Sequence, residues 1–521
     1  MDRQRGFLRR LILTIPPFSL SWKKCAPQPW LLFVVFYAIV ANVPFWAAGV
    51  WLGILPIGWF CLEYAGVGLL ALFIPRILAA ILLLLVIAAD LISAVSKTYY
   101  LAPTECLASV GSLHYLSGFR LFALGAVALL ALLVTSIAAF FPVAEVCKNG
   151  RLRAAICLMA FVVLVLSADA ISAFRETGRI PNPFGMDRPS DANKFSDFRN
   201  LWMSRYPTIR LMRNERLFGG RRNVLNAIQP DYSFVPSATA LAIKSIGITA
   251  DKRSTERPNV VLVLVESWGL AADLIVRDSL VQPYSEAALQ ARYHVTQGTV
   301  PFYGSTVAGE ARELCGNRIG THILDISANE SQACVPDQLT SHGYHSLAVH
   351  GMDGLMFNRT HWYTNLGFED QWFRNRFRQE GLPDCQGAFT GTCDAAVAGW
   401  IARRLEKGNQ IPDFLYWVTL NSHLPVPIPS ALPAGASCSL TPLLDKQPAF
   451  CSWYQLVANV HNSVFTVAMG KLNRPTVFVI VGDHAPPFAN PTLRSQFSET
   501  VVPYVLLVPR QQIRDADGRV R

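Results

Sequence analysis

The chain has 521 residues, of which 51% are hydrophobic, and it carries a formal net charge of +10 at pH 7. A chain of this length accommodates more than one domain. Apolar runs dominate residues 1–173, whereas the remainder has the composition of a water-soluble protein. The basic residues gather at the N-terminus, in short loops and in one linker, where membrane topology accounts for them. The positive charge therefore does not indicate nucleic-acid binding, and we expect no nucleic-acid partner.

Five stretches reach the roughly 20 apolar residues that a membrane-spanning helix needs. We predict spans at about 30–49, 51–74, 77–96, 121–141 and 154–173. With five spans, the basic residues near the N-terminus, at Arg76 and at 148–153 all fall on one side, which the positive-inside rule makes cytoplasmic. We therefore expect a multi-pass protein of a bacterial inner membrane, with a cytoplasmic N-terminus and a periplasmic soluble domain.

Three acidic residues, Glu63, Asp90 and Asp169, fall inside the predicted spans. Acids in a membrane usually face the interior of a helix bundle or water. Asp90 and Asp169 would lie near the outer leaflet, where they can receive a lipid head group. The alternatives are a hydrogen bond between packed helices, or snorkelling to the interface.

Residues 174–257 are predicted to form a linker. Its amphipathic pieces, such as 196–217, predict helices on the membrane surface, with a solvated connector as the alternative.

The soluble part contains six cysteines, which fall as three pairs of sequence neighbours. In an oxidising compartment, an even set of this kind forms disulfides. Pairing between neighbours is the simplest arrangement, and six buried thiols are the alternative. The six are Cys315, Cys334, Cys385, Cys393, Cys438 and Cys451.

From residue 258 onward, short apolar runs end in residues that can bind metal or move protons. Unbroken β-branched runs predict parallel strands covered on both faces, and the helical stretches between them predict an α/β domain with a mainly parallel sheet. Ligands of such sheets gather beyond the carboxyl ends of the strands. The residues at these ends are Glu266, His350, His423, Asp483 and His484.

The segment Gly304–Glu310 (GSTVAGE) predicts a tight turn followed by the start of a helix. Ser305 or Thr306 can cap this helix, and capping alone would explain the pair. A hydroxyl at a helix N-terminus also lies where anions bind well, because free N–H groups and the helix dipole point at it. Together with the strand-end residues, this position favours a nucleophile.

In this order and spacing, the motifs resemble the sulfatase-like transferases of the alkaline phosphatase superfamily. That group includes lipoteichoic acid synthase and the phosphoglycerol transferases of periplasmic glucans; lipid A phosphoethanolamine transferases are more distant relatives with a similar five-span build. The resemblance covers roughly 258–510 and implies an alkaline phosphatase/sulfatase-like fold for the soluble domain (258–521), which follows the predicted five-helix transmembrane bundle (1–173) and the linker (174–257). It rests on Asn259–Gly269, Gly304–Glu310, His350–Arg359, Ser422-His423 and Gly482–His484.

The resemblance also implies roles for individual residues. Thr306 would be the nucleophile, and Arg359, with Phe357 and Asn358, would hold the substrate phosphate. His423 would lie close to the transferred group, as a general acid or as a hydrogen-bond donor to the phosphate, and His350 would lie at the same edge. One divalent metal is expected, Mn²⁺ by resemblance, with Zn²⁺ or Mg²⁺ as alternatives. Its implied ligands are Glu266, Thr306, Asp483 and His484.

We therefore expect a phosphoglycerol transferase that moves a head group from phosphatidylglycerol to an envelope glycan or glycolipid through a phospho-threonine. The alternatives are a phosphoethanolamine transferase that uses phosphatidylethanolamine, a metal-dependent phosphodiesterase or sulfatase-like hydrolase, and a sensor that has lost catalysis. The complete ligand set argues against the sensor. No histidine follows His484, which weakens the phosphoethanolamine alternative. Cys25-Ala26-Pro27 and Cys334-Val335-Pro336 both lack the Arg of the sulfatase nucleophile sequence.

Overall fold

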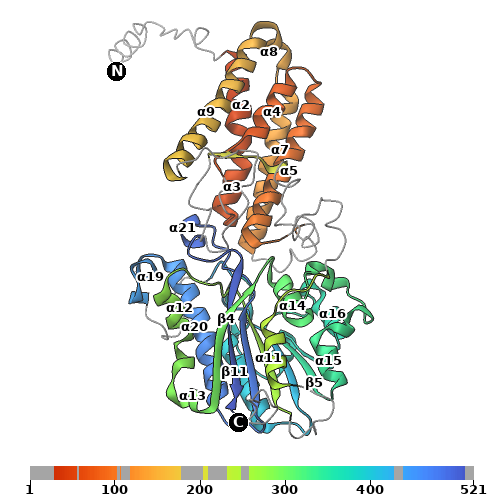
Figure 1. Ribbon diagram of the computed structural model, residues 1–521. Coiled ribbons are helices and arrows are strands. Elements are labelled where there is room, and N and C mark those ends of the chain that lie inside the picture. The colour runs from red at the N-terminus through yellow and green to blue at the C-terminus, as the bar shows by residue number, and fades with distance from the viewer. Residues whose placement is uncertain are drawn as a thin grey trace, which may run out of the picture.

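The computed structural model describes residues 28–54, 58–101, 106, 118–177, 203–208, 232–247, 257–426 and 438–510. Figure 1 shows a helical bundle at one end of the molecule and an α/β domain at the other. Most of the predicted linker, including all of 196–217 except 203–208, lies outside the described residues. The same holds for Cys25 and its sulfatase-like sequence.

Four described helical stretches are long and apolar enough to cross a membrane, namely Pro29–Leu52, Arg76–Tyr99, Gly118–Phe140 and Arg151–Ser172. The predicted second span, 51–74, is wrong as a single helix: among its described residues, Trp51 and Leu52 end the first stretch, and a separate short helix covers Leu62–Ala71. Gly53 and Gly58 both adopt positive φ, a conformation that ends helices. The hydropathy of the segment, averaged over many residues, does not reveal these breaks. The bundle comprises α2 (Pro29–Ala38), η2 (Val40–Asn42), α3 (Val43–Leu52), α4 (Leu62–Ala71), α5 (Arg76–Tyr99), α7 (Gly118–Phe140), α8 (Val143–Asn149) and α9 (Arg151–Thr177).

A short piece of the linker, residues 203–208, inserts into this bundle; we call it the anchor segment. Its strand β2 (Ser204–Arg205) pairs in parallel with β1 (Phe60–Cys61). The Asp169 carboxylate accepts hydrogen bonds from the Ser204 N–H (3.1 Å) and hydroxyl. The Glu63 carboxylate accepts from the Thr208 N–H at 3.0 Å. The anchor segment therefore satisfies acids that the helices carry into the bundle.

The centre of the anchor segment is the buried ion pair between Arg205 and Asp90. Arg205 Nε lies 2.7 Å from Asp90 Oδ2. The same carboxylate accepts from the Tyr64 hydroxyl at 2.8 Å, and Arg205 donates to Asn42 Oδ1 at 2.8 Å. The Arg205 guanidinium also lies 3.6 Å from the centroid of the Phe45 ring. The partners of this membrane acid are thus protein groups, as the packing alternative expected.

The α/β domain is built on a seven-stranded sheet, as far as the described residues show, in the order β4-β11-β10-β3-β9-β5-β6. The five strands from β10 to β6 are parallel, which confirms the predicted mainly parallel sheet. β11 and β4 join in antiparallel fashion, so the apolar run at 501–508 ends at the opposite edge, away from the polar strand ends. The strands are β3 (Asn259–Val265), β4 (Tyr293–Pro301), β5 (His345–His350), β6 (Asp370–Trp372), β9 (Asp413–Val418), β10 (Thr476–Gly482) and β11 (Val501–Pro509).

Helices cover both faces of this sheet, with α12 and α20 on one side and α14, α15 and α16 toward the other (Figure 1). Every residue of β3, β9 and β10 is buried, which explains their unbroken apolar sequences. A two-stranded sheet of β7 (Asp384–Cys385) and β8 (Gly391–Thr392) lies outside the main one. The domain's helices are α11 (Ala238–Ile246), α12 (Leu274–Val281), η6 (Gln282–Ser285), α13 (Ala287–Arg292), α14 (Thr306–Cys315), η7 (Gly320–Asp325), η8 (Glu330–Ala333), α15 (Val335–Ser341), η9 (Met356–Asn358), α16 (Arg359–Asn365), α17 (Arg374–Gln379), α18 (Asp394–Lys407), η10 (Cys438–Leu440), α19 (Pro442–Lys446), α20 (Pro448–Met469) and α21 (Pro491–Arg494).

The six cysteines of this domain form disulfides between sequence neighbours, as the simplest arrangement predicted. Cys334 is one of them, so the Cys-Val-Pro sequence that starts there holds a disulfide and no free thiol. Disulfides of this density are typical of oxidising compartments. The pairs are Cys315–Cys334, Cys385–Cys393 and Cys438–Cys451.

Candidate active site

Two neighbouring parallel strands bring the first three site residues together. β3 and β10 pair so that Val265 lies opposite Gly482. Glu266 follows the first strand, and Asp483 and His484 follow the second. The strand register therefore places these three polar side chains side by side at the carboxyl edge, where ligands of such sheets bind.

The hydroxyl of Thr306, the first residue of α14, completes a group of converging atoms. Thr306 Oγ1 donates to Glu266 Oε2 at 3.0 Å and lies 3.4 Å from His484 Nε2. His484 Nε2 is 3.3 Å from Asp483 Oδ2 and 3.6 Å from Glu266 Oε1. Ligand atoms of the two acids and the histidine all lie within 4.8 Å of one another, and all three residues are buried. The four residues expected from the sequence to bind metal are thus close neighbours.

The chemistry of these atoms fits a divalent cation. Asp483 Oδ2 is buried and has no hydrogen-bond partner among the residues that the structure describes. His484 Nδ1 lies 2.9 Å from the carbonyl of Ala485, which can only accept, so Nδ1 carries the proton and Nε2 turns its lone pair to the site. Two buried carboxylates with oxygens within 4.8 Å of each other repel unless a cation or a proton lies between them. Three oxygens and one nitrogen form a ligand set that Mn²⁺, Mg²⁺ or Zn²⁺ can occupy.

Burial and the nearby carboxylate of Glu266 raise the pKa of Asp483 well above its usual range. The folded metal-free protein therefore retains a proton on this carboxyl that the unfolded chain loses above an ordinary pKa of about 3.9. The free energy of unfolding of the metal-free protein should then fall as the pH rises from that value through the raised pKa. Metal competes with this proton, so metal binding should tighten as the pH rises.

This linkage predicts a thermal-shift experiment. We expect the increase in Tm on adding Mn²⁺ to the chelator-treated protein to be larger at about pH 8 than at about pH 5.5. Asp483→Asn removes the titrating group and should abolish both the shift and its pH dependence. An Mn²⁺-induced shift in the wild type that is equal at the two pH values would contradict the predicted proton competition.

Ser267, which the sequence interpretation did not single out, ties the two acids together. Its hydroxyl donates to Glu266 Oε1 at 2.7 Å, and its N–H donates to Asp483 Oδ1 at 2.7 Å. The residue adopts a positive φ of 58°, a strained conformation for a side chain other than glycine. Trp453 Nε1 donates to the Ser267 carbonyl at 2.8 Å and helps to hold this backbone. The only available signal in the sequence was its position directly after Glu266.

Helix α14 is locked against the Asp483 backbone, which fixes Thr306 relative to the strand ends. A Cβ on Gly309 would lie 3.0 Å from Asp483 Cβ, so glycine permits this close approach. Arg312, fully buried, donates to the carbonyl of Gly482 at 2.6 Å and pairs with Glu313 at 2.7 Å. Neither charged residue can be recognised from the sequence alone, because most Arg-Glu pairs in helices lie at the surface.

Arg359, the residue predicted to hold the substrate phosphate, already has a buried carboxylate partner. Its Nη2 lies 2.9 Å from Glu310 Oε2, and the same carboxylate accepts from the hydroxyls of Tyr363 (2.5 Å) and Tyr416 (3.1 Å). Phe357 contacts the guanidinium, 5.4 Å from ring centroid to Cζ. Arg359 is only 2% exposed. Its pairing with Glu310 ties the GSTVAGE helix to the start of α16, a connection that spacing alone could not predict.

Two further histidines lie at the same edge of the sheet, as the strand endings predicted. His350 Nδ1 donates to the carbonyl of Val418 at 2.9 Å. Burial, reinforced by the neighbouring Arg359, lowers the pKa of His350 to about 3, so the ring is neutral at physiological pH. The half-buried His423 donates from Nδ1 to the Leu424 carbonyl at 2.8 Å, and its ring packs 4.8 Å from that of Phe389.

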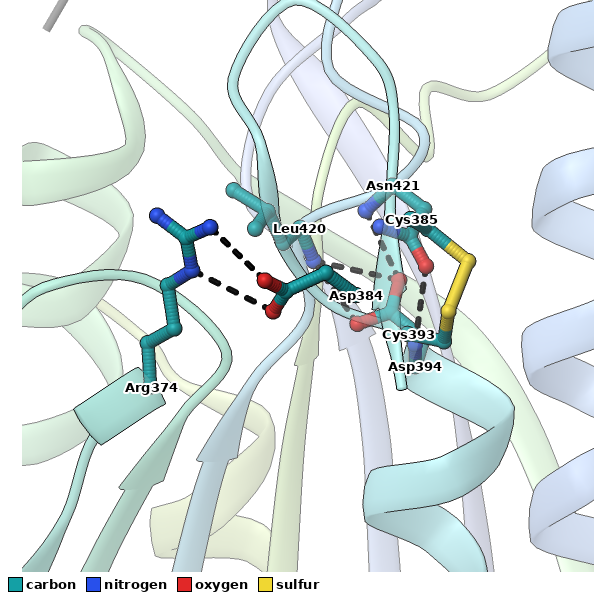
Figure 2. The surroundings of a disulfide bond; sticks show 7 residues. All are labelled: Arg374, Asp384, Cys385, Cys393, Asp394, Leu420 and Asn421. Atoms are coloured by element: carbon teal, nitrogen blue, oxygen red, sulfur yellow. Dashed lines mark hydrogen bonds and ion pairs between the residues drawn. A yellow bond between two sulfur atoms is a disulfide. The ribbon is translucent and has the colours of Figure 1, made fainter. Parts of the chain in front are cut away.

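A disulfide supports the loop that carries the second of these histidines (Figure 2). Cys385–Cys393 lies directly before Asp394, the first residue of α18. The Asp394 carboxylate accepts from the N–H groups of Leu420 (3.0 Å) and Asn421 (2.8 Å), and the Asn421 side chain accepts from the Asp394 N–H at 2.8 Å. Burial raises the pKa of Asp394 to about 7. The disulfide and this carboxylate thus fix the loop from its outer side.

Comparison with protein families assigns the soluble domain. Residues 258–518 match the model of the Sulfatase family. The chain belongs to the sulfatase family. The match confirms the resemblance to the wider superfamily.

Similar solved structures include three that share little sequence with this sulfatase-family chain. Lipoteichoic acid synthase LtaP from Listeria monocytogenes is 16% identical, with 52% of this chain and 71% of that chain covered and a TM-score of 0.35. Phosphoglycerol transferase GacH from Streptococcus pyogenes, in complex with sn-glycerol-1-phosphate, is 16% identical, covering 53% and 77%, with a TM-score of 0.34. The zinc complex of the periplasmic domain of EcEptC from Escherichia coli is 14% identical, covering 51% and 78%, with a TM-score of 0.32. A comparison with curated proteins gave no match.

Proposed function

We propose that this sulfatase-family protein is a membrane-anchored phosphotransferase that moves a phosphorylated head group from a phospholipid to an envelope glycan or glycolipid. The observation that carries the proposal is the convergence of Thr306 Oγ1 with ligand atoms of Glu266, Asp483 and His484. A threonine at a helix N-terminus suits nucleophilic attack on an anion, because the N–H groups of the first turn face the incoming oxygens. Four helices long and apolar enough to cross a membrane support a site that stays close to a lipid substrate.

A divalent metal bound by these four residues would lower the pKa of the threonine hydroxyl and neutralise phosphate charge. With its hydroxyl proton released to solvent, Thr306 Oγ1 would form a bond to the phosphorus of the donor as the bond to the diacylglycerol oxygen breaks. We assign to His423, as an imidazolium, the protonation of that leaving oxygen; the neutral ring would take a proton back from the acceptor hydroxyl in the second half. In the second half, a hydroxyl of the acceptor attacks the phospho-threonine, the bond to Thr306 Oγ1 breaks, and the enzyme is regenerated.

Phosphatidylglycerol is the donor that we favour, with Mn²⁺ as the metal. This choice rests on the Gly304–Glu310 sequence form and on the absence of a histidine after His484. The three disulfides of the described domain support a periplasmic location for the site, outside the inner membrane. The basic residues near the N-terminus, at Arg76 and at 148–153 support a cytoplasmic N-terminus.

Trapping the covalent intermediate tests the function and the donor together. Purified protein in lipid micelles is mixed with phosphatidylglycerol or phosphatidylethanolamine, quenched with acid, and analysed by intact and peptide mass spectrometry. We expect a glycerol-phosphate adduct on Thr306 and none with the second lipid. An ethanolamine-phosphate adduct would replace the donor assignment. Lipid turnover without any adduct would overturn the covalent mechanism.

A further inference from the structure

The membrane bundle supplies a side chain to the candidate active site. Helix α5 ends at Tyr99, and the next residue, Tyr100, turns into a left-handed conformation with a φ of 57°. The Tyr100 ring centroid lies 5.7 Å from that of His484 and 5.4 Å from that of Phe302, in an edge-on contact. A residue at the end of a transmembrane helix therefore packs on one of the proposed metal ligands.

The backbone of this tyrosine also approaches the nucleophile segment. A Cβ on Gly304 would lie 3.7 Å from the carbonyl oxygen of Tyr100. Gly304 stands two residues before Thr306, and Phe302 stands four residues before it. Tyr100 thus touches both halves of the site, the strand-end histidine and the turn that leads into α14.

Arg494 of helix α21 fastens the end of α5 in this position. Its guanidinium donates to the carbonyls of Lys97 (2.7 Å) and Thr98 (2.8 Å). The last carbonyls of a helix lack partners within the helix, and a cation at this end also complements the helix dipole. The same guanidinium lies 4.4 Å from the centroid of the Tyr100 ring. Arg494 is 1% exposed, so one buried cation holds both the backbone and the ring.

The contacts of Arg494 and His484 with the end of α5 fix the distance between the site and the membrane surface. The end of a transmembrane helix lies at the level of the lipid head groups, where tyrosine rings are frequent. The proposed ligand His484 lies against that helix end, so we expect the phosphate of a bilayer lipid to lie close to His484. A phosphodiester dissolved in water has no corresponding need for the α5 contact.

We propose that Tyr100 is a substrate-positioning residue at the end of membrane helix α5, whose ring packs beside His484 and forms the membrane-side wall for a phospholipid head group. This inference rests on the proposed function, because it concerns how the lipid donor is presented. It assigns to the ring a part in recognising a glycerophospholipid phosphodiester in the membrane. Arg494 maintains the ring in place.

The test compares Tyr100→Ala, Tyr100→Leu and Tyr100→Phe with wild type on two substrates. One substrate is phosphatidylglycerol in proteoliposomes, and the other is the water-soluble diester bis(4-nitrophenyl) phosphate. The matched control is Tyr99→Ala, which removes the same ring one position earlier. For Tyr100→Ala and Tyr100→Leu we expect kcat/KM on the lipid to fall about tenfold or more, since small misplacements of reacting groups have effects of this size. Activity on the soluble diester should change less than about threefold, and Tyr100→Phe and the control should stay close to wild type.

Metal content and Tm, measured on every variant, separate folding from function. Equal losses on both substrates in a folded, metal-loaded Tyr100→Leu protein would overturn the proposal, because the ring would then merely support the site. An unchanged rate on the lipid would overturn it as well. Failure of the wild type itself to consume phospholipid would instead refute the proposed function, so the two failures are distinguishable.

Discussion

Replacing Thr306 with alanine is expected to abolish head-group transfer, with a loss of at least about 10³-fold, as removal of a catalytic nucleophile commonly causes. The variant lacks the oxygen that lies 3.0 Å from Glu266 and 3.4 Å from His484, so neither the covalent bond nor the fourth ligand can form. Alanine is a good helix former, and Thr306 begins α14, so the fold should persist. Transfer from labelled phosphatidylglycerol in proteoliposomes measures the loss, and Tm checks the fold.

Ser305→Ala is the matched control for this experiment. Ser305 occupies the N-cap position of α14, yet within the described residues its side chain makes no capping hydrogen bond. Its removal should leave the transfer rate within about threefold of wild type and the stability nearly unchanged. If Ser305→Ala were inactive while Thr306→Ala remained active, the nucleophile would be Ser305, and the assignment drawn from the GSTVAGE motif would be wrong.

Breaking the ion pair of the anchor segment should have the largest effect on stability. Arg205→Ala leaves the Asp90 carboxylate buried without its cation, and Asp90→Ala leaves the guanidinium buried without its anion. Removing one partner of a buried pair typically costs about 3–5 kcal/mol of unfolding free energy. Unfolding of the detergent-solubilised protein in mixed micelles with increasing sodium dodecyl sulfate measures this change.

Two further variants test whether the loss of stability comes from an unpaired buried charge. The double replacement Asp90→Leu with Arg205→Met should be less destabilised than either single alanine variant, because no uncompensated charge remains. Lys471→Ala removes an exposed pair with Glu406, whose side chains are 85% and 54% exposed, and should change stability by less than about 1 kcal/mol. Single variants no less stable than this surface control would show that the anchor segment contributes little to holding the bundle.

The membrane bundle illustrates where local composition is a reliable guide and where it is not. Long apolar helices such as α5 and α7 were predictable, because a lipid environment demands about 20 apolar residues in a row whatever the rest of the chain does. The second predicted span was not a single helix, since averaged hydropathy does not register the backbone conformation of Gly53 and Gly58. The anchor segment could not be predicted for a different reason. Arg205 pairs with Asp90, which lies 115 residues earlier in the chain, and local composition does not show such a contact.

For the active site, the order of residues along the chain was enough to identify which of them follow the strand ends. Unbroken buried strands followed at once by Glu266, Asp483 and His484 require a parallel sheet whose carboxyl edge is polar, because all strands of such a sheet end at the same side. The residues that surround them become known only from the three-dimensional fold. The strand register, the lock of Arg312 on the Gly482 carbonyl and the contact of Tyr100 with His484 depend on segments distant in sequence. Such contacts are set by packing in three dimensions, which local residue patterns do not encode.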